Sequence, residues 1–198
     1  MGGDLESLND AELVALTRAG NLRAFNSLAR RWDSPLYRFV RRTIGNDEEA
    51  RDVCQETLLK AYQNIGRLRE PAKFKAWIHH IALNLCRDRF RSPRARARAE
   101  PYEESGDDAF RPEGAATWTH DGDARRAGLG RVLATALERL PVEQRTAILL
   151  KEYQGFSSEE IAEITGVPSA TVRTRIFYGL KAVRKILLQW GIEGASLG

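Results

Sequence analysis

Residues Ser158 to Leu180 have the types and spacing of a helix-turn-helix. Ala162 and Gly166 are four positions apart, and Val172 follows the glycine by six. A small residue lets two helices cross closely, a glycine accepts the positive φ of the turn, and a branched apolar residue anchors the second helix. The same set also occurs in plain helical hairpins, so the second helix has to distinguish the two.

The helix predicted after Pro168 has two different faces. At about 100° per residue its apolar face collects Val172, Ile176, Gly179, Leu180, Val183 and Ile186. The opposite face carries Arg173, Thr174, Phe177, Tyr178, Lys181, Arg184 and Lys185. Arginine can pair with guanine edges, threonine and phenylalanine can contact thymine methyls, and lysine can hold phosphates. The pattern favours DNA recognition; the alternative is that Phe177 and Tyr178 pack on a neighbouring helix.

A second polar face lies on the helix predicted after Pro71. His80, Asn84, Arg87 and Arg91 are spaced four, three and four residues apart, which places them on one side, and Trp77 lies at its edge. Cations, an amide and a nearby aromatic ring suit single-stranded nucleic acid, whose bases stack and form hydrogen bonds. A buried tryptophan beside a solvated polar face would explain the same residues.

The helix predicted from about residue 47 to 62 begins with carboxylates, namely Asp47, Glu48, Glu49, Asp52 and Glu56. Acidic residues near a helix N-terminus are favoured by the helix dipole. Asp52, Gln55 and Glu56 lie on adjacent turns, so docking on a basic partner is the other interpretation.

The sequence offers no support for an enzyme. Cys54 and Cys86, with His79 and His80, lack the CxxC or HxxxH spacing of a zinc site, and core packing of the cysteines is expected. No phosphate-binding glycine loop, HExxH motif or nucleophile elbow is found. We therefore expect no catalytic residue, no metal and no cofactor.

These residues are positioned by helices throughout. Four helical patterns precede residue 92. The first has Asp10 as N-cap and Gly20 as its stop, and the second, over 22–43, should be kinked or broken by Pro35. The third is capped by Asn46 or Asp47, and the fourth follows Pro71. Residues 92–127 are predicted to be a flexible acidic linker. Helices resume near Leu129, and Ser157 and Glu160 have capping-box spacing. We expect an all-α protein with helical domains over 8–91 and 128–190.

Composition agrees with a soluble protein. The 198 residues are 42% hydrophobic and 29% charged, enough to bury real cores, and no apolar run approaches the about 20 residues of a membrane span. No secretory signal is present and two cysteines make no disulfide framework, so a cytoplasmic location is expected.

The net charge is −1 over residues 1–66, +7 over 67–100, −6 over 101–124 and +4 over 125–198. Two basic blocks suggest two contacts with a polyanion, although solvated surface charge is an alternative.

The chain resembles bacterial extracytoplasmic-function (ECF) sigma factors, the two-domain specificity subunits of RNA polymerase. The resemblance rests on four blocks in family order: RAFNSLARRW, DEEARDVCQETLLKAY, FKAWIHHIALNLCRDRFR, and the segment from LERLPVEQRTAILL to TVRTRIF. It implies a factor that binds core polymerase through its β′ clamp helices and β flap and directs promoter-specific initiation. It also implies an anti-sigma factor as a partner and no insertion into a membrane.

The resemblance also implies roles for single residues. Asp52, Gln55 and Glu56 would dock on the polymerase. Asn84, with Lys60 and Leu68, would capture a base of the minus-10 element, and Arg173, Thr174, Phe177 and Tyr178 would read the minus-35 element. The helix faces described above add Trp77, His80 and Arg87 to the minus-10 contact and Lys181 to the minus-35 contact. Leu68 stands where many members have phenylalanine, and Tyr178 where relatives are often basic. The alternatives are a helix-turn-helix regulator that acts without polymerase and a pure interaction protein.

Overall fold

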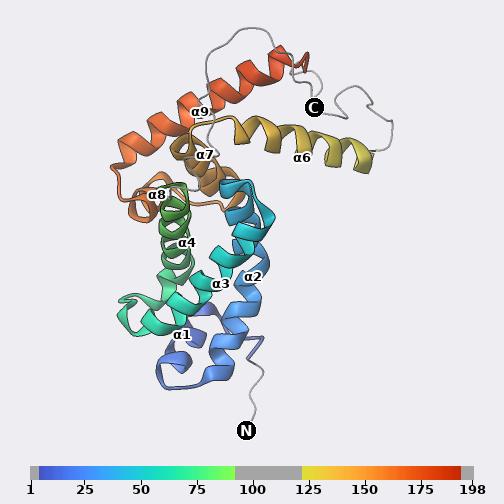
Figure 1. The fold of residues 1–198 in the computed structure, drawn as a ribbon. Coiled ribbons are helices and arrows are strands. Elements are labelled where there is room, and N and C mark those ends of the chain that lie inside the picture. Colours follow the sequence, from blue (N-terminus) through green and yellow to red (C-terminus); the bar gives the residue numbers. More distant parts are fainter. Residues whose placement is uncertain (1–4, 92–121, 193–198) are drawn as a thin grey trace.

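The computed structural model describes residues 5–91 and 122–192, which form helices with no strand among them. The elements in chain order are α1 (Asp10–Arg18), α2 (Leu22–Ile44), α3 (Asp47–Asn64), the short 3₁₀ turns η1 (Ile65–Arg67) and η2 (Pro71–Lys73), α4 (Phe74–Arg91), α6 (Gly122–Glu138), α7 (Val142–Ile148), the π-helical turn η3 (Leu149–Tyr153), α8 (Ser158–Thr165) and α9 (Ser169–Gln189). The all-α prediction is confirmed. Figure 1 shows α1 to α4 as one bundle, with α6 to α9 as a second group across the end where α8 meets α4.

Most of the predicted linker over 92–127 lies outside the described residues. Its last part, 122–127, belongs to α6, which begins at Gly122. Alanine and arginine in that stretch are good helix formers, which explains why the helix starts earlier than the position near Leu129 that periodicity predicted.

Side-chain caps fix where several helices begin. At the start of α1, Oδ1 of Asn9 accepts from the Glu12 backbone N–H at 3.0 Å, and the Glu12 carboxylate accepts from the Asn9 N–H at 2.8 Å. The prediction of Asp10 as N-cap was wrong, because the residue three positions after Asp10 is the apolar Leu13, which cannot complete the reciprocal pair. Asn46 caps α3.

The α2 helix runs through Pro35 without a break. A proline inside a helix costs roughly 3 kcal/mol, because it removes one hydrogen bond and crowds the preceding turn. Buried side chains on both sides of it, including Phe25 and Leu28 before and Phe39 and Val40 after, hold the helix against α1, α3 and α4. This burial outweighs the local penalty, so the predicted break is absent.

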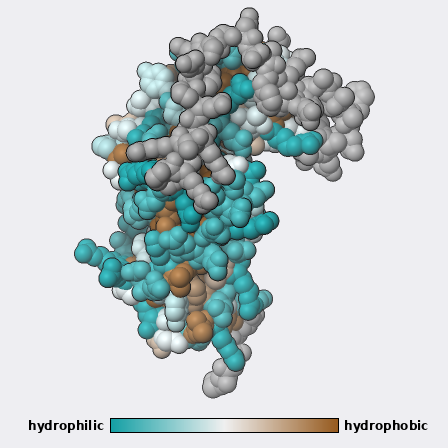
Figure 2. All heavy atoms as spheres, viewed as in Figure 1, coloured by the Kyte–Doolittle hydropathy of each residue, from teal (hydrophilic) through white to brown (hydrophobic). Residues whose placement is uncertain are grey.

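One continuous apolar core joins the two helical groups. In the first group it contains fully buried residues such as Leu36 and Ile78, and in the second Leu150 and Ile161. Cys54 and Cys86 are buried in the first group, as their apolar neighbours predicted, and burial raises the pKa of each thiol to about 12. Hydrophilic residues cover most of the face in Figure 2, with smaller hydrophobic patches toward its lower end.

Within the two described stretches, 5–91 and 122–192, no helix combines the length and apolar character needed to cross a membrane.

Candidate nucleic-acid and partner interfaces

The helix-turn-helix forms as the spacing predicted. Ser157 and Glu160 make the capping box that begins α8, and Gly166 ends it with φ +72°. Val172 then anchors α9, with 1% of its surface exposed. The turn and the anchor fix the angle at which α9 leaves α8, and therefore which of its residues face outward.

The packed face of α9 differs from the prediction at two positions, Leu180 and Leu187. Gly179 faces α7 so closely that an added Cβ would lie 2.7 Å from Cδ1 of Ile148. Leu180, which periodicity placed in the core, is 45% exposed, whereas Leu187 is buried. On a helix Leu180 is rotated by about 80° around the helix axis from Val172. It therefore lies at the edge of the narrow strip of α9 that packs on the other helices.

The outward face of α9 presents the predicted aromatic and basic residues. Phe177 is 64% and Tyr178 54% exposed, and their rings meet edge to face with centroids 5.3 Å apart. The alternative that they pack on a neighbouring helix does not hold for the described residues. Arg173 is also exposed; its Nη1 donates to Oγ of Ser169 at 3.4 Å and lies 3.6 Å from Oε1 of Glu159. Thr174 and Lys181 are exposed on the same face.

On α4 the structure brings together the polar residues that helical spacing had aligned. Asn84 lies between two of them: its Nδ2 is 3.0 Å from Nε2 of His80, and its Oδ1 accepts from Arg87 at 3.4 Å. This arrangement makes Nε2 of His80 the acceptor, so the proton of the neutral ring is on Nδ1. Burial is the main cause that lowers the pKa of Arg87, and the positive charge of the nearby Arg175 lowers it further.

The far ends of this row contact the second helical group. Nδ1 of His80 donates to the Ile164 carbonyl at 2.8 Å, and Nη2 of Arg87 donates to the Thr165 carbonyl at 2.9 Å. Both carbonyls lie at the C-terminal end of α8. The helix-turn-helix therefore rests on the polar face of α4.

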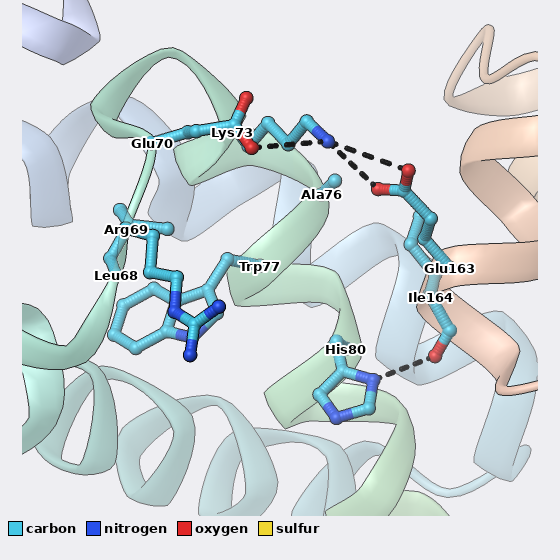
Figure 3. A pocket seen from close by; sticks show the side chains of 9 residues that line it. All are labelled: Leu68, Arg69, Glu70, Lys73, Ala76, Trp77, His80, Glu163 and Ile164. Atoms are coloured by element: carbon cyan, nitrogen blue, oxygen red, sulfur yellow. Dashed lines mark hydrogen bonds and ion pairs between the residues drawn. The ribbon is translucent and has the colours of Figure 1, made fainter.

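A cavity of about 270 Å³ opens beside this contact (Figure 3). Leu68 and Trp77 form part of its apolar wall, and His80 and Lys73 line it together with Glu163 of α8. Lys73 reaches across to Glu163, with Nζ 3.3 Å from Oε2. Lys60 does not line this cavity in the described part of the chain; it pairs with Glu56 at 3.0 Å.

The sequence analysis missed several residues that join the two groups. Lys75 donates to the Gln154 carbonyl at 2.6 Å and lies 4.4 Å from the ring centre of Phe156. Arg42 stacks over Tyr153 at 4.2 Å. No local pattern could have found these pairs, because each joins residues far apart in the chain.

The comparisons with known proteins match both helical groups. The model for Sigma-70 region 2 matches residues 28–96, and that for Sigma-70, region 4 matches residues 130–183. The chain is 35% identical over 175 residues to the ECF RNA polymerase sigma factor SigM of Mycobacterium tuberculosis, covering 87% of this chain and 82% of that protein. It is 33% identical over 183 residues to the RNA polymerase sigma-H factor of Pseudomonas aeruginosa, covering 90% and 93%.

This chain belongs to the ECF sigma factors. The region 2 match spans the candidate residues of α3 and α4, and the region 4 match spans those of α9. The α1 helix precedes the region 2 match.

Solved structures agree with this assignment. The fold is similar to that of CnrH, solved in complex with the cytosolic domain of CnrY, with a TM-score of 0.64 and 27% identity over 90% of this chain and 96% of that one. It also resembles the sigma factor RpoE of Bartonella quintana, solved with the anti-sigma factor NepR, with a TM-score of 0.60 and 22% identity over 84% and 98%.

The acidic residues of α3 in this sigma factor divide into two sets. Asp47 accepts hydrogen bonds from Arg41 and Tyr37, and that from Arg41 is the main cause that lowers the pKa of its carboxyl. Asp52 and Gln55, further along α3, are exposed, whereas Glu56 is half-buried and pairs with Lys60 at 3.0 Å and Arg89 at 3.5 Å. Asp47 thus joins the start of α3 to α2, while Asp52 and Gln55 face solvent.

Proposed function

We propose that this ECF sigma factor binds core RNA polymerase and directs promoter-specific transcription initiation. The observation that carries the proposal is the pair of matches, region 2 over 28–96 and region 4 over 130–183, in one chain. In this proposal, residues 8–91 bind polymerase and open the minus-10 element, residues 128–190 recognise the minus-35 element, and residues 92–127 link the two.

The minus-35 duplex would be recognised by α9. The exposed face of this helix offers Arg173 to a guanine edge and Thr174 and Phe177 to thymine methyls. Lys181 would neutralise a phosphate, and Tyr178, beside Phe177, would extend the apolar contact. An exposed pair of aromatic rings among cations supports this role, because no packing partner in the described structure accounts for it.

The minus-10 element would be opened on α4. Trp77 would supply apolar surface for an unstacked base, with Leu68, 5% exposed, behind it in the cavity wall. The amide of Asn84 and the imidazole of His80 would supply hydrogen bonds to the edge of the base. Arg87 and Lys60 would hold the backbone of the displaced strand.

Polymerase binding would use Asp52 and Gln55, which are exposed on α3, and the half-buried Glu56 beside them, on the β′ clamp helices. The second helical group would bind the β flap. In this proposal the sigma factor is not an enzyme: bond formation belongs to the polymerase, and the factor needs no catalytic residue, metal or cofactor. It would act in the cytoplasm.

An anti-sigma factor is a proposed partner, supported by the complexes in which CnrH and RpoE were solved.

Run-off transcription tests the proposal. Core polymerase, this protein and fragmented genomic DNA should give discrete transcript starts that depend on the protein, with two shared elements upstream of them. A helix-turn-helix regulator that acts without polymerase is not favoured, since region 2 would then have no role. It would instead bind duplex DNA at a palindromic site without polymerase and give no starts.

A further inference from the structure

The α1 helix precedes the region 2 match, and neither the proposed contacts with DNA nor those with polymerase use it. It nevertheless packs against η1 and η2, the two short turns of the connection that joins α3 to α4 over residues 65–73 (Figure 1). The buried side chains of α1 are Leu13, Val14 and Thr17. A helix fixed by its own buried face beside this connection is placed to hold the backbone of the connection.

The 65–73 connection is mostly exposed. Its buried residues are Ile65 and Leu68. The first turn is closed by a backbone hydrogen bond from the Leu68 N–H to the Ile65 carbonyl at 3.3 Å, which is longer than the usual 2.7–3.2 Å of such bonds. A turn closed by so long a bond depends on contacts from outside the connection to keep its shape.

Arg18, the last residue of α1, makes such a contact. Its Nε donates to the same Ile65 carbonyl at 3.2 Å, across 47 positions of the chain. The oxygen therefore accepts one hydrogen bond from the turn and one from α1. Leu68 follows this turn directly and lines the cavity beside Trp77 (Figure 3), so Arg18 holds one wall of the proposed base site.

A second series of contacts connects the first residue of α1 to Trp77. Oδ2 of Asp10 accepts a hydrogen bond from Nε1 of Trp32 at 2.9 Å. The ring of Trp32 packs on Phe74 with centroids 6.5 Å apart, and Phe74 packs on Trp77 at 6.1 Å. Both distances lie within the range of favourable aromatic pairs. The two ends of α1 are thus connected to the two apolar residues of the cavity wall.

We infer that α1 is a positioning element for capture of the minus-10 base, with Arg18 as the residue that sets the position of Leu68. The inference rests on the proposed function, since it takes the cavity beside Leu68 and Trp77 as the base site. Arg18 acts through the Ile65 carbonyl and does not touch the strand. A site whose supporting contacts are removed holds its walls less precisely and discriminates less between ligands.

The test measures base preference with the holoenzyme formed from core polymerase and the full-length protein. The probes are minus-10 non-template single strands that carry each of the four bases, or an abasic site, at the captured position. That position is the one at which an abasic site most weakens binding of the unaltered holoenzyme, measured by fluorescence anisotropy.

Arg18→Ala should reduce the preference for the best base over the worst by about fivefold, the effect of one ordinary hydrogen bond. Its affinity for the abasic strand should be unchanged, because that strand offers no base to the site. A role in stability alone would lower the free energy of unfolding, measured with urea, and leave the ratio of affinities among the four bases as it was.

Arg18→Lys is the rescue variant. The lysine side chain is long enough to bring an N–H donor to the Ile65 carbonyl, and it should restore most of the base preference. Arg30→Ala is the matched control, since it removes the same charge from an exposed position on α2. It should leave the base preference unchanged.

Three results would overturn the inference. The first is an unchanged base preference in Arg18→Ala, and the second is an equal loss of preference in Arg30→Ala. The third is a loss in Arg18→Lys as large as that in Arg18→Ala, because a donor to the Ile65 carbonyl would then not be what matters. Failure of the proposed function would be seen in the unaltered protein instead, as an absence of protein-dependent transcript starts.

Discussion

The imidazole of His80 on α4 donates a hydrogen bond to the carbonyl of Ile164 on α8, across 2.8 Å and 84 positions of the chain. The bond requires the proton on Nδ1, and the amide of Asn84 fixes it there by donating to Nε2. A side chain proposed to bind DNA is therefore oriented by its own helix and occupied by the other helical group. This relationship connects promoter recognition to the arrangement of the two groups.

Removing the guanidinium of Arg173 should weaken recognition of the minus-35 element. We expect Arg173→Ala to cost about 1–3 kcal/mol in binding and to relax discrimination at one base pair, since a bidentate pair with guanine is lost. Competition binding of the holoenzyme to promoters with single substitutions measures this. Lys181→Ala is the comparison: a phosphate contact should weaken all sequences alike and reduce the salt dependence. Unchanged base preference in Arg173→Ala would refute the assignment.

Asn84→Ala should impair promoter opening while leaving polymerase binding intact. Loss of the amide removes hydrogen bonds to the extruded base, so the fraction of promoter DNA that is open should fall roughly tenfold. Permanganate reactivity of thymines in the minus-10 region reports opening. Gln63→Ala removes an exposed amide on α3 and serves as the control. Normal reactivity in the Asn84 variant would count against its proposed role.

Charge reversal at Asp52 should weaken the complex with core polymerase. Like charges placed opposite one another are costly, and we expect Asp52→Arg to reduce affinity by at least about tenfold. Because Asp52 is exposed, the thermal unfolding of the free protein should be unchanged. Competition for labelled core polymerase is the measurement, with Asp33→Arg, exposed on α2, as control. Equal affinity of the two variants would contradict the docking assignment.

Gly179→Ala should destabilise the second helical group. The new Cβ would lie 2.7 Å from Cδ1 of Ile148, and overpacking of about 1–3 kcal/mol exceeds the about 1 kcal/mol that alanine gains in a helix. Urea unfolding measures the difference. Ile148→Val removes Cδ1, the atom in conflict. The double variant should therefore lose less free energy of unfolding than the two single variants lose together. Gly130→Ala in α6, where the added Cβ would meet no atom of the described residues within 4 Å beyond its own turn of helix, should stabilise the protein instead.

The buried His79 should make stability depend on pH. Burial lowers its pKa to about 4 from 6.5, although the hydrogen bond that its Nδ1 makes to the Lys75 carbonyl, at 2.8 Å, opposes the shift. Between these values the unfolded chain binds a proton that the folded protein does not, so stability is lost as pH falls below 6.5. From pH 7 to 5 the loss from this group is about 2 kcal/mol.

His79→Leu isolates this effect. Urea unfolding at several pH values should show a shallower fall in stability between pH 7 and 5 than in the unaltered protein. Equal slopes would mean that His79 already titrates normally in the folded state.

The sequence alone determined the helices and the character of their exposed faces. Capping pairs such as Ser157 with Glu160, and a glycine such as Gly166 where φ must be positive, act within a few residues and can be recognised without the fold. The exposure of Phe177 followed from helical spacing, and the burial of Cys54 from its apolar neighbours in the sequence. Spacing was insufficient at Leu180, because the width of a contact depends on the helix that packs against it.

Only the tertiary structure decided which of these faces are free. α2 passes through Pro35 because distant helices bury its two halves, and Gly179 is needed because α7 crosses there. The sequence placed His80, Asn84 and Arg87 on one side of α4, but whether that side meets solvent or α8 depends on atoms more than 70 positions away. Local interactions fix local structure, whereas long-range packing sets the accessibility of the site.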